Sequence, residues 1–244
     1  MSHPSVDLDC AEAALGFHLS DPVTAGVALS PWHDGFSRLE FLGDAILGLA
    51  LYADVARRDL SFEVAAELVS NRHLDAVFHH TLRRCTSADT GDVIEAVIGA
   101  AHLARGYEAA ADLARRVTGF VDRYGDLPTR AASHRATATV GSVALRAVAA
   151  DWVCLEHPDA PHRVLSDRRD ALIRRARLGA LARRTRGVSS APRVHRDAAA
   201  VVRLYTRVGG AYWREGWIGA VRAVVAAGVL PRLGAEPPAS PARS

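Results

Sequence analysis

Two acidic side chains lie four residues apart within one long apolar segment of the sequence. Glu40 and Asp44 interrupt the run FSRLEFLGDAILGLALYADVAR, residues 36–57, which is apolar almost all round and therefore typical of a buried helix. A spacing of four places both carboxylates on one face of that helix, where like charges repel each other. No arginine stands three or four residues away on that face, so another group must neutralise the pair.

A second acidic pair, Asp92 and Glu95, begins the apolar segment GDVIEAVIGAAHLA, again with both residues on one helix face. Two such helices together predict an oxygen-rich site for Mg²⁺ or Mn²⁺, which prefer carboxylates and water as ligands. This kind of site supports phosphodiester hydrolysis, because a bound metal activates water and neutralises the charge that develops at phosphorus. The alternative is that each pair is only a solvated helix face, which is the usual explanation for a single pair.

The sequence around these acids resembles the ribonuclease III family. RLEFLGDAILG, residues 38–48, is similar to the family's signature, and DVIEAVIGA, residues 92–100, is similar to its second acidic motif. The resemblance implies an all-α endonuclease domain with four residues that bind the catalytic Mg²⁺ (or Mn²⁺): Glu40, Asp44, Asp92 and Glu95. Within that set it implies that Glu95 is a direct metal ligand and that Asp44 lies beside it.

The chain departs from the family pattern at several places. Phe36 and Ser37 stand where the family has Asn-Glu, and the Glu and Arg that usually precede the segment at Leu68 are not recognisable. The stretch from Leu68 to Asp92 is short, and no double-stranded-RNA-binding domain follows. These differences put the substrate in doubt more than the metal site.

Composition and spacing favour an all-α fold of about ten to a dozen helices, because Ala, Leu and Arg have high helix propensity and no run of alternating strands appears. The stretch GDLPTRAAS, residues 125–133, is predicted to be a linker, since Pro128 breaks any helix. The Pro-rich tail is expected to be disordered. We therefore expect a catalytic domain over residues 1–127, a second domain over 128–233 and a tail over 234–244.

The two halves look like a diverged repeat. LGDAILGLALYADV from Leu42 aligns with VGSVALRAVAADWV from Val140, and IGAAHLARGY from Ile98 aligns with VGGAYWREGW from Val208. The shared frame pairs three glycines: Gly43 with Gly141, Gly99 with Gly209, and Gly106 with Gly216. If each unit covers an apolar face of the other, the chain folds as an internal pseudo-dimer.

In this frame the second half lacks all four acids, which are replaced by Ala138, Ser142, Val202 and Tyr205. It cannot build a carboxylate metal site. If the halves pair as the family's dimer does, we expect one active centre, which cuts one strand where the symmetric dimer of the family cuts both. The family resemblance also implies that Phe41 inserts into a socket of the partner domain; the alternative is an ordinary core position. Whether the pseudo-dimer dimerises again is left open.

Charge is divided between the halves. Residues 1–127 hold 19 Asp and Glu against 10 Arg, a net of −9, whereas residues 128–244 hold 8 against 20, a net of +12. All 30 basic residues are Arg, which excludes the Lys chemistry of a P-loop or a Schiff base. A dense run in the second half can bind phosphates or face the acidic half, and both interpretations stand. The run consists of Arg168, Arg169, Arg174, Arg175, Arg177, Arg183, Arg184 and Arg186.

No basic and apolar leader opens the sequence, and no uncharged apolar run approaches about 18 residues, so we expect a soluble cytoplasmic protein with no membrane partner. Cys10, Cys85 and Cys154 are far apart and odd in number. A disulfide or a thiolate zinc site is therefore not expected, which fits a reducing compartment.

The function these features favour is that of a divalent-metal-dependent endoribonuclease, acting on double-stranded or structured RNA through the four acids. One alternative keeps the site but moves it to a small molecule of specialised metabolism, which biosynthetic genes nearby would support. Another is a non-catalytic RNA-binding scaffold. The intact acids argue against a scaffold, because it gains nothing from repulsive carboxylates in an apolar helix.

Overall fold

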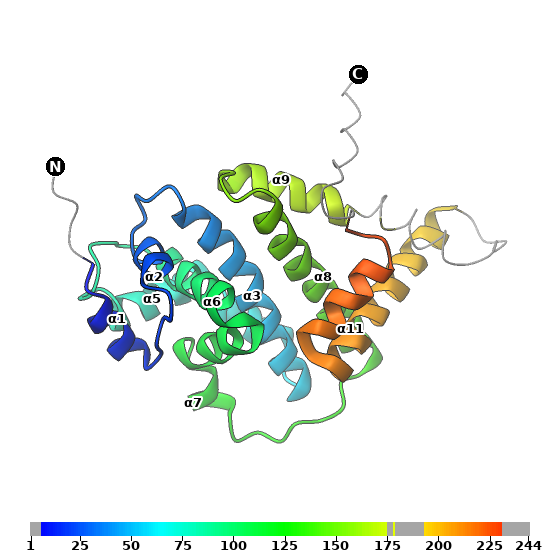
Figure 1. The fold of residues 1–244 in the computed structure, drawn as a ribbon. Coiled ribbons are helices and arrows are strands. Elements are labelled where there is room, and N and C mark those ends of the chain that lie inside the picture. The colour runs from blue at the N-terminus through cyan, green and yellow to red at the C-terminus, as the bar shows by residue number, and fades with distance from the viewer. Residues whose placement is uncertain (1–5, 175–177, 179–192, 231–244) are drawn as a thin grey trace.

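The computed structural model of the chain describes residues 6–174, 178 and 193–230, and every regular element in those ranges is a helix (Figure 1). The prediction of an all-α fold is confirmed. The helices are α1 Leu8–Leu15, α2 Pro22–Ala28, α3 Phe36–Arg57, α4 Phe62–Leu68, α5 Asn71–Thr81, α6 Asp92–Val117, α7 Phe120–Tyr124, α8 His134–Glu156, α9 His162–Ile173 and α11 Arg193–Ala226.

Capping side chains fix where several helices begin. The Ser61, Ser70 and Ser133 hydroxyls accept backbone N–H groups in the first turns of α4, α5 and α8. Asp7 and Asp21 carboxylates do the same for α1 and α2. These bonds satisfy donors that a helix start leaves without an intrahelical partner.

Helix α3 lies at the centre of the fold, and its backbone lies directly against that of α6. A Cβ added to Gly43 would collide with the Glu95 carbonyl oxygen, and one added to Gly99 would collide with the Leu39 carbonyl oxygen. Two facing glycines therefore allow the helices to approach far more closely than side chains permit. This approach sets the distance between the acids of α3 and those of α6.

The second half repeats this packing between α8 and α11. A Cβ on Gly141 would collide with the Tyr205 carbonyl oxygen, and one on Gly209 with the Thr137 carbonyl oxygen. Both α6 and α11 also contain one non-helical residue in their second half, Gly106 with φ 80° and Gly216 with φ 63°. These are the glycines paired in the repeat frame.

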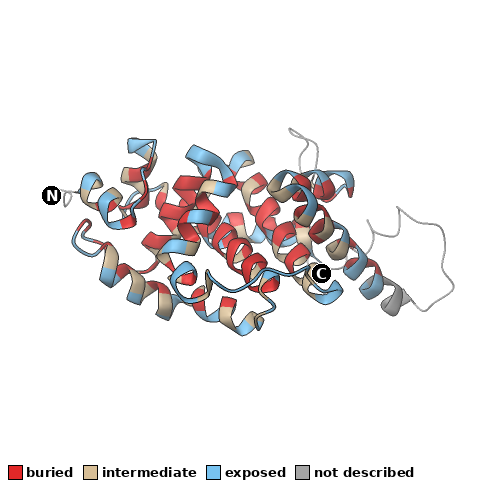
Figure 2. Ribbon diagram, turned by 90° about the horizontal axis from the view of Figure 1, so that it is seen from below, coloured by how far each residue is buried: buried red, intermediate tan, exposed pale blue. Residues whose placement is uncertain are grey.

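The two halves meet where α3 and α8 lie side by side (Figure 1), and both helices are buried along most of their length (Figure 2). Away from this contact, polar and aromatic groups join α6 to the second half. His102 Nε2 lies 3.2 Å from an Asp151 carboxylate oxygen. The Tyr107 and Tyr212 hydroxyls are hydrogen-bonded at 2.8 Å, and the Tyr107 ring stacks on Trp217. The aromatic side chains of α11 thus serve the core.

Helix α8 has the length and composition of a membrane span, the one such helix among the described residues. Most of its apolar window is buried inside the fold, against α3 and α11. Core helices often show the same composition, so it is weak evidence for a membrane.

Residues 125–133 contain no helix, as expected for the connection between α7 and α8. The tail over 234–244 lies outside the described residues, as do the arginines of the run from Arg175 onward. The described part of that run is structural in places: Arg169 is buried, and Arg168 donates a hydrogen bond to His157 at 2.8 Å.

The prediction that no disulfide forms is wrong, because Cys10 and Cys85 are bonded to each other. The Asp7 N–H donates a 3.0 Å hydrogen bond to the Cys85 carbonyl, which brings the start of α1 against the turn that follows α5. A separation of 75 residues hides this proximity in the sequence. Cys154 is free and buried, and with a disulfide present the cysteines no longer support a reducing compartment.

Candidate metal centre

The four predicted acids lie on the two helices that cross at Gly43. Glu40 and Asp44 project from α3, while Asp92 and Glu95 belong to the first turn of α6. The N-terminus of a helix carries partial positive charge, which favours the second pair there.

Three of the four acids converge. Glu40, Asp92 and Glu95 each contribute one carboxylate oxygen to a group in which all lie within 4.8 Å of one another. Glu95 is the least exposed of the three. Asp44 is exposed and stays outside the group, although it lies close enough to affect the charges of Glu40 and Glu95.

Burial and mutual repulsion make two of these carboxyl groups hard to ionise. Burial, followed by the charges of Asp92 and Asp44, raises the pKa of Glu40 to about 7. Burial, followed by the charges of Asp44, Asp92 and Glu40, raises the pKa of Glu95 to about 9. Both effects disfavour the charged form, and a bound cation would reverse them.

No cation among the described residues neutralises this group. None of the four carboxylates forms an ion pair or accepts a hydrogen bond from another described residue. Elsewhere the fold does pair its buried acid: Asp54 lies between Arg58 and Arg115. An unpaired set of oxygen donors fits a hard divalent cation such as Mg²⁺ or Mn²⁺, so the residues present suit the predicted ion.

Comparison with known proteins links this geometry to a family. The chain is 38% identical over 104 residues to Ribonuclease 3 of Rhodopseudomonas palustris, an alignment covering 34% of this chain and 38% of that protein. It is 36% identical over 104 residues to Ribonuclease 3 of Nitrobacter winogradskyi, covering 34% and 39%. It is 31% identical over 125 residues to Ribonuclease 3 of Chlorobium chlorochromatii, covering 42% and 47%.

About a third to two fifths of the chain is thus similar to part of proteins named Ribonuclease 3. The chain spans less than half the length of these relatives, and no family model matches it. In this chain, two glycine-packed helices of an all-α fold bring the acids together.

The second half has the same kind of helix crossing without the four acids. Ala138 and Ser142 stand on α8, and Val202 and Tyr205 on α11, in the places of the four acids. Tyr205 faces Gly141 through its carbonyl oxygen as Glu95 faces Gly43. No oxygen-rich group can form from these four side chains.

Phe41 inserts into the second half, as the family resemblance implies. Its ring is almost fully buried and stands edge-on to the His162 ring, with centroids 5.4 Å apart. The Arg169 guanidinium lies 5.0 Å from the centre of the same ring. The socket is therefore built by α9, which follows α8 in the second half.

One residue that supports the site is not predicted by any pattern in the sequence. The Asp75 carboxylate accepts a 2.6 Å hydrogen bond from the Gly91 N–H, immediately before Asp92. This bond ties the first turn of α6 to α5 and so fixes the acids that begin α6. No spacing rule pairs residues 16 apart, so nothing in the sequence indicated this contact.

Proposed function

We propose that the chain is a divalent-metal-dependent endoribonuclease that hydrolyses phosphodiester bonds of double-stranded or structured RNA. The observation that carries this proposal is the convergence of Glu40, Asp92 and Glu95 within 4.8 Å, with no neutralising cation among the described residues. Their helices carry the two motifs that resemble the ribonuclease III family, and relatives named Ribonuclease 3 support the assignment.

In this proposal the four acids divide the work of the site. Glu40, Asp92 and Glu95 hold Mg²⁺ or Mn²⁺ directly, and the ion supplies Lewis-acid chemistry for hydrolysis when bound. Asp44, exposed at the solvent side, accepts hydrogen bonds from water that enters the site. Protons held by Glu40 and Glu95 must leave before the ion can bind.

The proposal includes a duplicated architecture, with a catalytic domain over residues 1–127 and an acid-free domain over 128–233. The matching glycine contacts at Gly43 and Gly141 support it, as do the matching non-helical glycines of α6 and α11. A molecule of this kind has one cutting centre and cleaves one strand of a duplex per encounter. We propose RNA as its partner. The cytoplasmic location expected from the sequence loses the support of the cysteines, because Cys10 and Cys85 are bonded.

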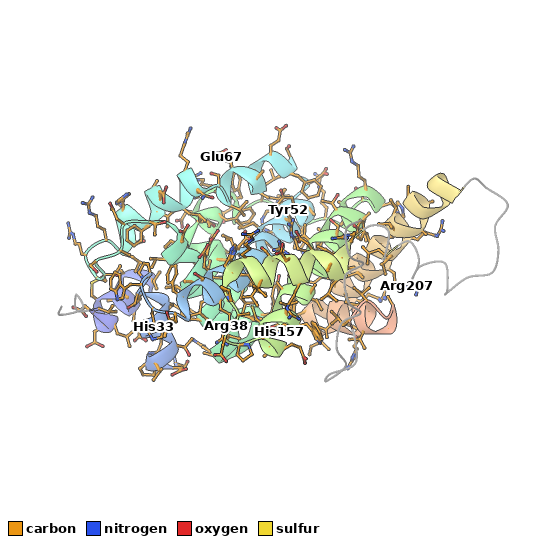
Figure 3. The ribbon with its side chains drawn as sticks, turned by 90° about the horizontal axis from the view of Figure 1, so that it is seen from above. His33, Arg38, Tyr52, Glu67, His157 and Arg207 are labelled. Carbon is orange, nitrogen blue, oxygen red and sulfur yellow. A yellow bond between two sulfur atoms is a disulfide. The ribbon has the colours of Figure 1, made fainter. Side chains whose placement is uncertain are left out.

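Cleavage of duplex RNA with and without Mg²⁺ tests the proposal, with two matched glutamate variants. Glu95→Gln removes a carboxylate of the site and is expected to abolish cleavage. Glu67→Gln removes one from the exposed outer face of α4 and is expected to leave cleavage unchanged (Figure 3). Products carrying 5′-phosphates are expected. Metal-independent cleavage, no cleavage of any RNA tried, or equal activity of the two variants would overturn it.

A further inference from the structure

Helices α3 and α8 run antiparallel in a register that two contacts define. Near the middle of α3, a Cβ on Gly48 would lie 3.9 Å from a Val143 methyl group. Near its start, the Cys154 thiol lies 3.9 Å from the Arg38 carbonyl oxygen. From the first contact to the second, α3 runs ten residues toward its start while α8 runs eleven residues toward its end, as in an antiparallel pair. This register places Arg146 opposite Ala45, the neighbour of Asp44.

Arg146 is exposed although the residues beside it, Leu145 and Ala147, are fully buried. Asp44 is likewise exposed between buried neighbours of α3. Each of these two largely buried helices therefore has one exposed side chain at the same level of their contact: Asp44 on α3 and Arg146 on α8.

The arginine lies on the face of α8 that corresponds to the acid-bearing face of α3. Ser142 takes the place of Asp44, and Arg146 follows it by four residues, which puts both on one helix face. Arg135, seven residues before Ser142, shares that face and is also exposed. The repeat implies that α3 and α8 are related by a twofold axis, and antiparallel helices so related present equivalent faces to the same side. Together with the register, this puts Arg146 on the side of the molecule that carries the acids.

Neither arginine is paired with an acid among the residues that the structure describes. Neither Arg146 nor Arg135 forms an ion pair or a side-chain hydrogen bond with another described residue. Their separation of 11 positions corresponds to roughly 16 Å along the helix, at about 1.5 Å per residue. They are therefore too far apart to bind one phosphate together, and each is available to a different one.

We propose that the acid-free half binds RNA through this face, with Arg146 holding a backbone phosphate beside the cleavage site and Arg135 holding another further along α8. The proposal rests on the proposed endoribonuclease function and adds a role for the second half: it grips the backbone where the first half cuts it. Guanidinium groups are the preferred partners of phosphates, and the contact reads no sequence.

Salt dependence of RNA binding tests the proposal without requiring cleavage. Binding of a labelled RNA duplex is measured by anisotropy, without divalent metal, over a range of NaCl concentrations. Each phosphate contact contributes about 0.9 to the slope of log K against log salt in a duplex. Arg146→Gln is expected to reduce that slope by about 0.9, and the double variant with Arg135→Gln by about twice as much.

Arg207→Gln provides the matched control, because it removes the same charge from another helix of the same half. Arg207 is exposed on α11 two residues after Tyr205, which places it on the far side of that helix from the acid-equivalent positions (Figure 3). Its slope is expected to equal that of the unaltered chain. The melting temperature of each variant shows that the exposed substitutions leave the fold intact.

The outcomes separate this proposal from the function on which it rests. If the unaltered chain cleaves RNA but Arg146→Gln keeps the full slope, the role of Arg146 is overturned and the endoribonuclease stands. If Arg146→Gln lowers only the melting temperature, the arginine serves to balance the charge of Asp44, which also overturns it. If the unaltered chain neither binds nor cleaves RNA, both proposals fail.

Discussion

Glu40 of α3 and Glu95 of α6 bring carboxylate oxygens within 4.8 Å of each other in a partly buried site. Burial and the neighbouring acids raise the pKa of Glu40 to about 7 and that of Glu95 to about 9. Near neutral pH the pair therefore holds protons that a metal ion must displace. This competition gives the site a pH dependence that an exposed acidic cluster would not show.

Metal affinity is expected to rise with pH from about 6 to about 9 and then level off. At pH 8 Glu40 is mostly ionised but Glu95 is not, so binding of Mn²⁺ is expected to release about one proton, and affinity to change up to about tenfold per pH unit. Calorimetry in buffers of different ionisation enthalpy measures the protons released. An affinity that does not change over this range would contradict the arrangement.

The same groups are expected to make the metal-free protein less stable as pH rises. A carboxyl group whose pKa is raised by folding stabilises fully below its unfolded value of about 4.5, and that contribution disappears as pH passes the folded values near 7 and 9. Allowing for the partial exposure of Glu40, we expect a loss on the order of 1–3 kcal/mol between pH 5 and pH 9.

Thermal unfolding of the metal-free chain at several pH values measures this loss. Glu95→Gln removes the group with the larger shift, so its stability should vary less with pH. Saturating Mn²⁺ should restore stability most at high pH, because an ion that binds only the folded state shifts the equilibrium by mass action. A melting temperature that rises from pH 5 to pH 9 without metal would have the wrong sign.

Three Gly→Ala variants test whether the close helix approach builds the site. Gly43→Ala and Gly141→Ala both force a Cβ into the facing backbone, and each is expected to cost about 3 kcal/mol or more. Only Gly43→Ala displaces Glu95, so it alone should also weaken Mn²⁺ binding. Gly26→Ala on α2 meets no atom within 4 Å and should be neutral or stabilising by up to about 1 kcal/mol.

Unfolding in urea with calorimetric titration of Mn²⁺ separates these effects. If Gly43→Ala keeps full stability, the backbones of α3 and α6 are not in the described contact. If Gly141→Ala, once folded, weakens metal binding as much as Gly43→Ala does, the site depends on both halves equally.

Loss of the bond between Cys10 and Cys85 is expected to lower the free energy of unfolding by about 2–4 kcal/mol, because the bond restricts the unfolded chain across a 75-residue separation. Cys10→Ser with Cys85→Ser should match the effect of a reductant. Cys154→Ser leaves the bond intact and separates thiol loss from disulfide loss. As an internal check, the free energy of unfolding of the double serine variant should be the same with and without reductant. If it equals that of the unaltered oxidised chain, the stabilising role of the bond is contradicted.

The sequence was most informative where chemistry and periodicity coincide in one segment. The apolar run around Glu40 predicted a buried helix, and the structure buries most of α3. The repeat frame paired Gly43 with Gly141 from residue order alone, and both are glycines that the backbone approach requires. Resemblance to the ribonuclease III family placed Phe41 at the second half, where it lies against α9.

What the sequence missed depends on contacts between distant segments. The partners of Phe41, the disulfide and the Asp75 bond to Gly91 join residues that no local period connects. The exposure of Asp44 was hidden for another reason. Asp44 shares a helix face with Glu40, but its carboxylate is exposed and lies outside the group formed by Glu40, Asp92 and Glu95.

A duplex RNA labelled differently on its two strands, digested with Mg²⁺ under single-turnover conditions, tests the central claim most directly. Denaturing gels report cuts in either strand, and native gels report breaks in both. The expected result is metal-dependent cleavage on denaturing gels, with duplexes that remain whole on native gels, and no cleavage by Glu95→Gln. Double-strand breaks appearing as fast as single cuts, or no metal-dependent cleavage, would contradict a single carboxylate centre acting on RNA.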